Sequence, residues 1–473
     1  MNISRLIVPA LRWRDDTGFS HEGARIDDAL AQGVGGFIIF GGTADGVRAL
    51  TQSLAARSAH PLLIASDLER GAGQQFSGLT QVPPPRALSA LDREDVLRWA
   101  GAVTAREALD VGVNWVFAPV ADLDVLADNP IVQTRAFGAE PEAVSQAVAS
   151  WVRGCQDAGA LACAKHYPGH GRTTVDSHIA LPTVTSSREE LEQSDLVPFR
   201  AAVEAGVASL MTAHVAYPAL DPSGLPATLS SAILRQLRAD GFDGLIVSDA
   251  LIMEGALGGR TEAEAAVQAV AAGVDVLLYP DQPREVAQAL ERALADGRLA
   301  EKEIAASIAR VERALAAVQR GPSSASAGPQ SVDEIAQSLL ELPLARGAAP
   351  ALSAPLELVL VDDDQGGPYP ASPTDAVGTG LARLGVPIGA GGSKVVLLFA
   401  EPRAWKGRSG LGADAHALLQ AHAASAALVV LFGHPRLVEE IPGGPPVLVA
   451  WHRQRLMQGA VAHWLAHALG VRA

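Results

Sequence analysis

The feature that most constrains the fold is an alternation of short apolar runs with longer Ala-rich segments over about the first 318 residues. The eight apolar runs are ISRLIVPAL, GGFIIFGG, PLLIASD, VNWVFAPV, ALACAKH, ASLMTAH, GLIVSDA and VDVLLYP. Amphipathic segments such as EAVSQAVASWVRGCQDAG separate them, and many end at a glycine, as helices often do. Eight strand–helix repeats over this length predict an α/β fold of the (β/α)8 barrel type, which we place at residues 1–320.

A second domain follows a stretch of low complexity. The sequence GPSSASAGPQS, residues 321–331, is typical of a flexible linker, and we place the linker at 321–345. Beyond it, the runs LELVLVDDD, KVVLLFAEP, AALVVLFGHP and PPVLVAW alternate with helical segments. Strands that are apolar throughout indicate a parallel sheet covered on both faces. We therefore predict a smaller open α/β sandwich domain at 346–473, and the absence of a G-x-G-x-x-G motif gives no support to dinucleotide binding.

Charge and composition restrict the partners. The chain has 37 Lys and Arg against 52 Asp and Glu, a formal net charge of -15, and no run of basic residues. We therefore predict no nucleic-acid partner and no membrane partner. No apolar stretch reaches the roughly 18 to 20 residues that a membrane span needs. The sequence does not specify the oligomeric state.

The cysteines and the N-terminus bear on the compartment. Cys155 and Cys163 are too few for a disulfide framework, so we predict two buried thiols and a cytoplasmic location. The N-terminal MNISRLIVPALRWRDD has no long apolar core and no small-residue cleavage site, so it is predicted to be a first strand. A chain whose leader had been removed would look the same.

Polar residues gather where the apolar runs of the predicted barrel end. Six runs end in this way, and the residues are Asp67, Asp122, Lys165 with His166, His214, Asp249 and Asp281. An Asp at such a place also caps the next helix, so a single one carries little weight. Because the carboxyl ends of barrel strands converge on one face, six together predict a functional site there.

The densest polar segment is KHYPGHGRTTVDSH, Lys165 to His178. Pro168, Gly169 and Gly171 prevent a helix, so we predict a loop. Asp176 lies two residues before His178, close enough for its carboxylate to orient the imidazole and raise its basicity, as a general acid/base requires. The alternative is an Asx-type turn with an exposed histidine.

The same segment admits a metal site, since His166, His170, Asp176 and His178 are all possible ligands. Two histidines four residues apart bind zinc when a helix places them on one face, and Pro168 and Gly169 between His166 and His170 argue against that helix. We predict no metal and no organic cofactor.

A second centre is GLIVSDALIMEG, residues 244–255, where Asp249 directly follows an apolar strand. A carboxylate at that place could be a base, a metal ligand or a nucleophile, and the spacing does not choose among them.

Four segments carry a resemblance to glycoside hydrolase family 3, and within it to the β-N-acetylglucosaminidase branch, over residues 30 to 320. The segments are NWVFAPVADLDVLADNPIVQTRAFG, KHYPGHGRTTVDSH, MTAHVAYPALD and GFDGLIVSDALIMEG. The C-terminal part, with VVLFGHP, is more weakly similar to the family's α/β sandwich domain.

The resemblance implies a retaining mechanism, in which Asp249 forms a covalent glycosyl-enzyme and His178, paired with Asp176, is the acid/base. It also implies that the innermost sugar is bound by Asp67, Arg135, Lys165 and His166. His214 is either a site group or a satisfied core histidine. The expected substrate is a small carbohydrate with a terminal β-linked N-acetylglucosamine, such as a peptidoglycan fragment or a chitin-type oligosaccharide.

Two departures from the branch affect specificity. In DLERGAGQQF, Gln75 replaces the usual Arg, and Ala250 replaces the second Asp of the usual S-D-D. Three alternatives therefore stay open. The first is a β-glucosidase or other exo-β-glycosidase of the family whose acid/base is Glu401 of the second domain. The second is a phosphorylase, because a histidine repels phosphate less than a carboxylate does. The third is a sugar-binding protein without activity.

Overall fold

The structure is a computed structural model, and it describes residues 2–175, 177, 179–319, 321, 331–366 and 373–471. Asp176 and His178, the predicted acid/base pair, lie outside the described residues, as does linker segment 322–330. The chain divides into two compact units. The first contains Met1–Thr80, Glu94–Val125 and Ala136–Gly328, and the second contains Gln81–Arg93, Leu126–Arg135 and Pro329–Ala473.

The first unit is a parallel barrel. Its strands are β1 (Ile7–Val8), β2 (Ala10–Arg12), β3 (Gly36–Phe40), β4 (Leu63–Ser66), β5 (Trp115–Val116), β6 (Leu161–Tyr167), β7 (Ser209–Thr212), β8 (Leu245–Ser248) and β9 (Leu277–Leu278). Strands β2 to β8 form one sheet in sequence order, and β1 pairs with β9. A bridge between Val247 and Val276 joins β8 to the segment before β9, and only Pro9 separates β1 from β2. The ring is therefore closed, and the predicted (β/α)8 barrel is confirmed.

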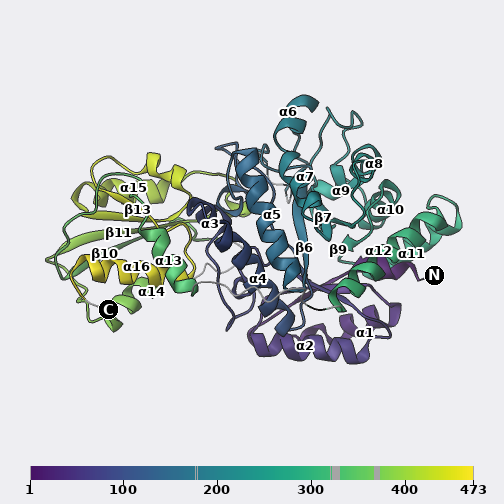
Figure 1. Ribbon diagram of the computed structural model, residues 1–473, viewed down its shortest axis with the longest axis horizontal. Helices are drawn as coiled ribbons and strands as arrows, with labels where there is room; N and C mark the ends of the chain where they lie inside the picture. Colours follow the sequence, from purple (N-terminus) through teal and green to yellow (C-terminus); the bar gives the residue numbers. More distant parts are fainter. Residues whose placement is uncertain are drawn as a thin grey trace. The chain divides into compact units, whose positions relative to one another are not determined.

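Helices surround these strands (Figure 1). They are α1 (Gly23–Gln32), α2 (Ala44–Arg57), α4 (Glu94–Asp110), α5 (Pro141–Asp157), α6 (Arg188–Gln193), α7 (Val197–Glu204), α8 (Ser231–Ala239), α9 (Glu254–Leu257), α10 (Glu262–Ala272), α11 (Pro283–Ala295) and α12 (Glu301–Gln319). Glycines set the close packing of α4 on α5. A Cβ on Gly101 would lie 2.2 Å from the carbonyl oxygen of Trp151, so only glycine allows this approach.

The interior of the barrel is packed with side chains rather than open. Alternate strand residues meet there, and they include Val8, Ile38, Leu63, Trp115, Phe117, Leu161, Cys163, Met211, Leu245 and Val276. Burial raises the pKa of the Cys163 thiol to about 12 and that of the Cys155 thiol as well, and both cysteines are free and buried as predicted. Because the interior is filled and apolar, the polar groups of a site must come from beyond the strand ends.

The second unit is an open α/β sandwich, as predicted. Strands β10 (Leu356–Asp362), β11 (Ser393–Ala400), β12 (Leu428–Gly433) and β13 (Val447–Val449) form a parallel sheet in this order. Helix α15 (Ala413–His422) lies on one side of the sheet, and α14 (Ala376–Arg383) and α16 (Arg455–Ala468) lie on the other (Figure 1). Helix α13 (Val332–Leu340) occupies part of the segment predicted to be a linker, because Ser331 and Glu334 form a capping box at its start.

Two segments that follow barrel strands in the sequence belong to the second unit. Residues 81–93, which contain α3 (Pro85–Ala90), follow β4, and residues 126–135 follow β5. Gln454 donates to the carbonyl of Val82 at 3.0 Å, and the amide of Leu456 donates to Gln81 at 3.2 Å. These contacts join positions more than 370 apart in the chain, so no local pattern predicted them.

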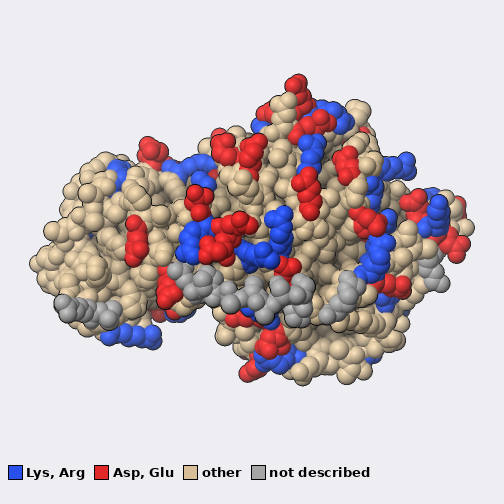
Figure 2. Space-filling model, viewed as in Figure 1, with Lys and Arg blue, Asp and Glu red and all other residues tan. Residues whose placement is uncertain are grey.

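Charges of both signs are interspersed over the face shown in Figure 2. Within the described part of the chain, no helix is both long and apolar enough to cross a membrane.

Candidate active site

Polar side chains stand at the carboxyl ends of four barrel strands. Asp67 directly follows β4, Lys165 and His166 lie near the end of β6, His214 follows β7 by two residues, and Asp249 directly follows β8. The strands are parallel members of one sheet, in which β6, β7 and β8 are neighbours and β5 separates β4 from β6, so these residues share one end of the barrel.

The Lys165 ammonium is buried between two carboxylates. Its Nζ lies 2.6 Å from Oδ1 of Asp67 and 2.8 Å from Oε1 of Glu69, and the side chain is 3% exposed. A buried ammonium is tolerated only when it is paired in this way. Glu69 is buried, whereas the Asp67 side chain is 29% exposed. Asp67 is therefore the more accessible of the two carboxylates. Glu69 was not predicted from the sequence as a partner of Lys165. The available signal was its position two residues after Asp67, in Asp67-Leu68-Glu69.

The register of β6 against β7 shifts at His166. Consecutive strand residues normally point to opposite faces. Here the pairing with β7 shifts by one residue, because Lys165 pairs with Met211 and Tyr167 pairs with Thr212. His166 is the extra residue, and such an insertion re-aims side chains.

His166 is held by a fully buried carboxylate. Nδ1 of His166 lies 2.7 Å from Oδ2 of Asp122, whose Oδ1 accepts the backbone amides of His166 at 3.1 Å and His170 at 2.7 Å. Burial acts to raise the pKa of Asp122, but the charge and hydrogen bond of His166 outweigh it and hold this pKa below its ordinary value. The pair fixes the ring, and Nε2 has no hydrogen-bond partner among the described residues.

His170 is buried and bonded at both ring nitrogens. Nδ1 lies 2.8 Å from Oγ1 of Thr173, and Nε2 lies 3.0 Å from Oγ of Ser177. Burial, followed by the nearby His166, lowers the pKa of His170 to about 4, so the ring is neutral near pH 7. Within the described residues, no group of three or more His, Cys, Asp or Glu side chains has an arrangement that could hold a metal ion.

Asp249 lies half-buried at the end of β8, and its Oδ1 accepts the amide of Ala250 at 2.7 Å. His214 is fully buried, with Nδ1 2.8 Å from Oγ1 of Thr228 and Nε2 3.1 Å from the carbonyl oxygen of Ala250. A carbonyl oxygen only accepts, so Nε2 carries the proton. His214 therefore braces the turn that carries Asp249.

Gln75 and Asp281 have partners outside this cluster, and Arg135 belongs to the second unit. Gln75 accepts the amide of Gly41 at 3.0 Å. The Asp281 side chain is 65% exposed and pairs with Arg25. Arg135 ends a 3-10 helix in the second unit, so its expected sugar contact stays a prediction.

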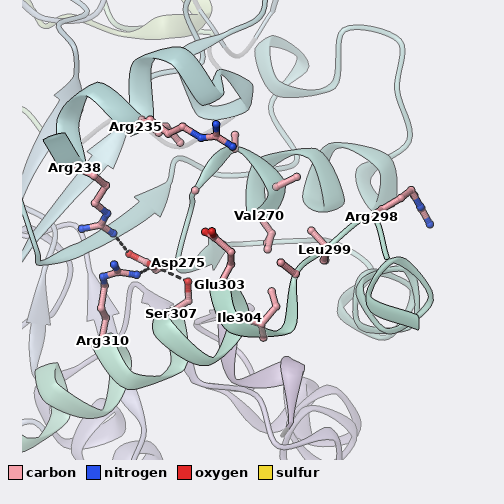
Figure 3. Close-up of a pocket in the computed structure, with 15 residues that line it drawn as sticks. Arg235, Arg238, Val270, Asp275, Arg298, Leu299, Glu303, Ile304, Ser307 and Arg310 are labelled. Atoms are coloured by element: carbon pink, nitrogen blue, oxygen red, sulfur yellow. Dashed lines mark hydrogen bonds and ion pairs between the residues drawn. The ribbon is translucent and has the colours of Figure 1, made fainter. Parts of the chain in front are cut away.

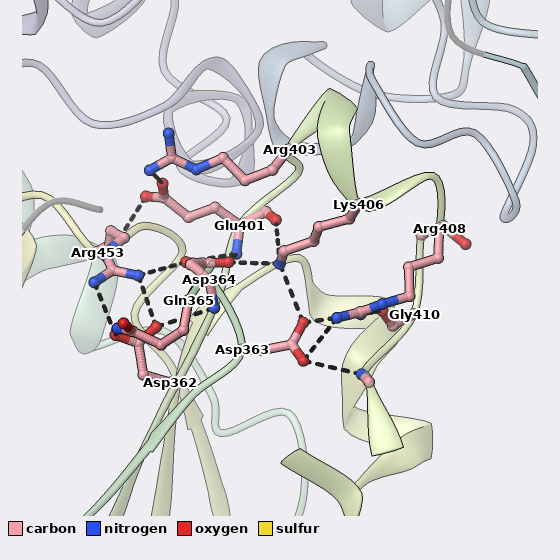
Figure 4. Close-up of polar contacts among 12 residues, drawn as sticks. Asp362, Asp363, Asp364, Gln365, Glu401, Arg403, Lys406, Arg408, Gly410 and Arg453 are labelled. Carbon is pink, nitrogen blue, oxygen red and sulfur yellow. Dashed lines mark hydrogen bonds and ion pairs between the residues drawn. The ribbon is translucent and has the colours of Figure 1, made fainter. Parts of the chain in front are cut away.

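Glu401, the alternative acid/base, lies in an ion-pair network of the second unit (Figure 4). Its Oε2 lies 2.8 Å from Arg403, and its Oε1 lies 2.8 Å from Nε2 of His452 and accepts the amide of Arg453 at 3.1 Å. The network also contains Asp362, Asp363, Asp364, Lys406 and Arg408. Both carboxylate oxygens of Glu401 are therefore engaged within its own domain, as those of a structural residue are.

A cavity of about 260 Å³ lies at the opposite, amino-terminal end of the barrel strands (Figure 3). Asp275, just before β9, is buried there and accepts hydrogen bonds from Arg238, from Arg310 at 3.1 Å and from Ser307 at 2.7 Å. Arg238 also donates to the carbonyl of Gly244, just before β8. This network links the segments just before β8 and β9. None of its residues belongs to the cluster around Asp249.

Comparisons with known proteins agree with this arrangement. The sequence profile of the family "Glycosyl hydrolase family 3 N terminal domain" matches residues 20–314 of this chain. The β-hexosaminidase of Chromobacterium violaceum is 41% identical over 286 residues, which cover 58% of this chain and 78% of that protein. The β-N-acetylglucosaminidase/β-glucosidase of Cellulomonas fimi is 34% identical over 289 residues, covering 59% of this chain and 51% of that protein.

A solved structure matches both units. The family 3 β-N-acetylglucosaminidase of a Paenibacillus species aligns with a TM-score of 0.84 and 27% identity, covering 100% of this chain and 96% of that one. The resemblance expected from the motifs is thereby confirmed, and the chain belongs to glycosyl hydrolase family 3.

Proposed function

We propose that this protein is a retaining β-N-acetylglucosaminidase that releases terminal β-linked N-acetylglucosamine. The observation that carries the proposal is the carboxylate of Asp249 at the end of β8, at the same end of the barrel as the paired Lys165 and His166. The 41% identity to a β-hexosaminidase supports the same substrate class.

In the first step, an oxygen of Asp249 attacks the anomeric carbon while the bond to the leaving oxygen breaks. His178 gives its proton to that oxygen, with Asp176 stabilising the imidazolium. In the second step, neutral His178 takes a proton from water, and the resulting hydroxide displaces Asp249 from the sugar. The Ala250 amide holds Oδ1 of Asp249, which fixes the rotation of the nucleophile.

The sugar is bound by groups whose own partners fix their positions. Asp67 accepts a ring hydroxyl, and Lys165 donates to another from between its two carboxylates. His166 presents Nε2 because Asp122 holds Nδ1. Charge-assisted hydrogen bonds of this kind are strong and directional. Arg135 is proposed as a further sugar-binding residue on the family resemblance alone, and His214 acts through the turn of Asp249.

Peptidoglycan fragments are the proposed natural substrates. A histidine acid/base carries no negative charge in either step, so it repels an anionic leaving part less than a carboxylate would. The lactyl carboxylate of muramic acid is such a part. The same property favours attack by phosphate, which the experiment below separates from hydrolysis.

The test is turnover of the 4-nitrophenyl β-N-acetylglucosaminide and the matching β-glucoside, each with and without phosphate. We expect N-acetylglucosamine to be the product at a kcat/KM well above that on the glucoside, whether or not phosphate is present. Sugar 1-phosphate as the main product would make the protein a phosphorylase. A preference for the glucoside would make it a β-glucosidase, and binding without turnover would make it a sugar-binding protein.

A further inference from the structure

We propose that His170 is a positioning residue that helps to hold Ser177 against helix α9, and that fixing Ser177 positions the proposed acid/base pair. The proposal rests on the proposed function, because Asp176 and His178 are the residues on either side of Ser177 in the sequence. His170 does not touch the substrate in this scheme, and its proposed effect passes through Ser177.

The directions of the hydrogen bonds assign the proton on His170. The hydroxyl of Thr173 donates to the carbonyl oxygen of His170 at 3.0 Å, so it accepts from Nδ1 at 2.8 Å. A neutral imidazole with its proton on Nδ1 accepts at Nε2, and the hydroxyl of Ser177 therefore donates to Nε2 at 3.0 Å. Ser177 is 2% exposed and His170 is 3% exposed, so water competes little for this bond.

A second tie holds Ser177 from the other side. Its carbonyl oxygen accepts the amide of Gly255 in α9 at 3.0 Å. A Cβ at position 255 would lie 2.8 Å from that oxygen, so the absence of a side chain permits the contact. The side chain of Ser177 is thus held by the loop after β6, and its backbone is held by the helix that follows Asp249.

Asp122 contacts both His170 and His166, the histidine that is proposed to bind the sugar. Oδ1 of Asp122 accepts the amide of His170 at 2.7 Å, and its Oδ2 pairs with Nδ1 of His166. The buried carboxylate therefore fixes the start of the loop to the group that is proposed to bind the sugar. His170 in turn bonds Ser177, which is the residue between Asp176 and His178 in the sequence.

The hydrogen bonds that hold Ser177 are expected to affect the rate of proton transfer by the proposed acid/base pair. A residue spans at most about 3.6 Å, so fixing Ser177 limits where its two neighbours can reach. An error of about 1 Å in a catalytic group can cost a hundredfold in rate. His170 itself is a poor acid/base, because both of its nitrogens are bonded and the ring is buried.

The test compares aryl β-N-acetylglucosaminides whose phenols range from acidic to weakly acidic. Proton donation matters little for an acidic phenol and strongly for a weak one, so its loss makes the dependence of the rate on phenol pKa steeper. We expect His170→Ala and Ser177→Ala each to lower kcat/KM at least tenfold on the weakest phenol and to change it little on the most acidic one. The double variant should be no worse than either single variant.

Two further variants separate positioning from general damage. His170→Gln keeps an acceptor for Ser177 and should restore part of the rate on the weak phenol. Ser209→Ala removes a similarly buried hydroxyl that accepts the Trp115 indole N–H at 2.8 Å, away from the loop, and should leave the slope unchanged. A wild-type slope in both Ser177→Ala and His170→Ala would overturn the proposal, as would an equal steepening in Ser209→Ala.

His178→Ala, measured in the same series, separates this proposal from the proposed function. If His178→Ala keeps the wild-type slope, the acid/base assignment is wrong, and the positioning role is wrong with it. If the slope of the rate against phenol pKa is steep in His178→Ala but that of the wild type in His170→Ala and Ser177→Ala, the acid/base assignment stands. The positioning role alone is then wrong.

Discussion

The amide of Gly255 donates to the carbonyl oxygen of Ser177 at 3.0 Å, which joins the loop after β6 to the short helix after β8. One of these segments contains the proposed acid/base residues and the other follows the proposed nucleophile, Asp249. A Cβ on Gly255 would also lie 3.0 Å from Cβ of His214, which braces the turn of Asp249. The contact therefore couples the positions of the two halves of the proposed chemistry.

Gly255→Ala should impair catalysis more than folding. The added methyl group must push Ser177 or His214 aside, so we expect kcat on a nitrophenyl N-acetylglucosaminide to fall about tenfold to a hundredfold. Gly23→Ala is the matched control, because Gly23 has helical backbone angles and no atom within 4 Å of the added Cβ. Equal kcat values for the two variants would show that the contact at Gly255 does not matter for turnover.

His170 should make the barrel less stable as the pH falls from about 6.5 to about 4. Burial lowers the pKa of His170 to about 4 in the folded state, from the ordinary value of 6.5. Between these values the unfolded chain binds a proton that the folded chain does not, so the free energy of unfolding falls, by at most about 3 kcal/mol. The folded-state pKa of Asp122 is also lowered, so its contribution is lost only below its ordinary pKa of 3.8.

This pH dependence is measured by urea unfolding followed by tryptophan fluorescence, at several pH values within the window. His170→Gln has no group to titrate there, so its stability should depend less on pH than that of the wild type. Parallel curves for the two proteins would mean that His170 is not held neutral.

Glu401→Gln should weaken the second unit and leave the chemistry unchanged. The substitution removes the charge that faces Arg403 and His452, and breaking a buried ion pair costs about 3–5 kcal/mol. Scanning calorimetry should show a lower unfolding temperature, while the slope of the leaving-group series stays that of the wild type. A steep slope in Glu401→Gln would assign the proton to the second unit and favour the β-glucosidase alternative.

Chelation should not affect turnover. Nδ1 of His166 is engaged by Asp122, and both nitrogens of His170 are engaged by hydroxyl groups, so binding a metal would break these contacts. Neither proposed step uses a Lewis acid. We expect the same kcat/KM before and after exhaustive dialysis against EDTA. A loss of activity that zinc restored would place these histidines in a ligand role.

Much of the barrel could be predicted because its signal is local. Each apolar run contains a buried strand, and six of the eight runs end in a polar residue at the carboxyl end of the strand. Asp67 and Asp249 follow directly from this rule, because each comes immediately after the last residue of its strand.

The details of the site depend on contacts that leave no local pattern. Period-two alternation assumes an unbroken strand, and the sequence gives no sign of the register shift at His166, where Lys165 pairs with Met211 and Tyr167 pairs with Thr212 of β7. Asp122 was predicted only as a strand-end residue, and its partners are the His166 side chain and the amides of His166 and His170, 44 and 48 positions along the chain. Ser331 and Glu334 are a local signal for the start of helix α13. This signal was missed because residues 321–345 were assigned to a linker on the basis of the low-complexity stretch 321–331.

If Asp249 is the nucleophile, it forms a covalent bond to the sugar, and a slowly released substrate can trap this intermediate. The protein is incubated with 5-fluoro-N-acetylglucosaminyl fluoride, which reacts with a nucleophile quickly and is released slowly, and peptides are analysed by mass spectrometry. We expect one sugar on the peptide that contains Gly244–Gly255, with fragmentation placing it on Asp249, and none in Asp249→Ala, whose kcat/KM should be lower by several orders of magnitude. Turnover without any adduct, or an adduct on another residue, would contradict the account.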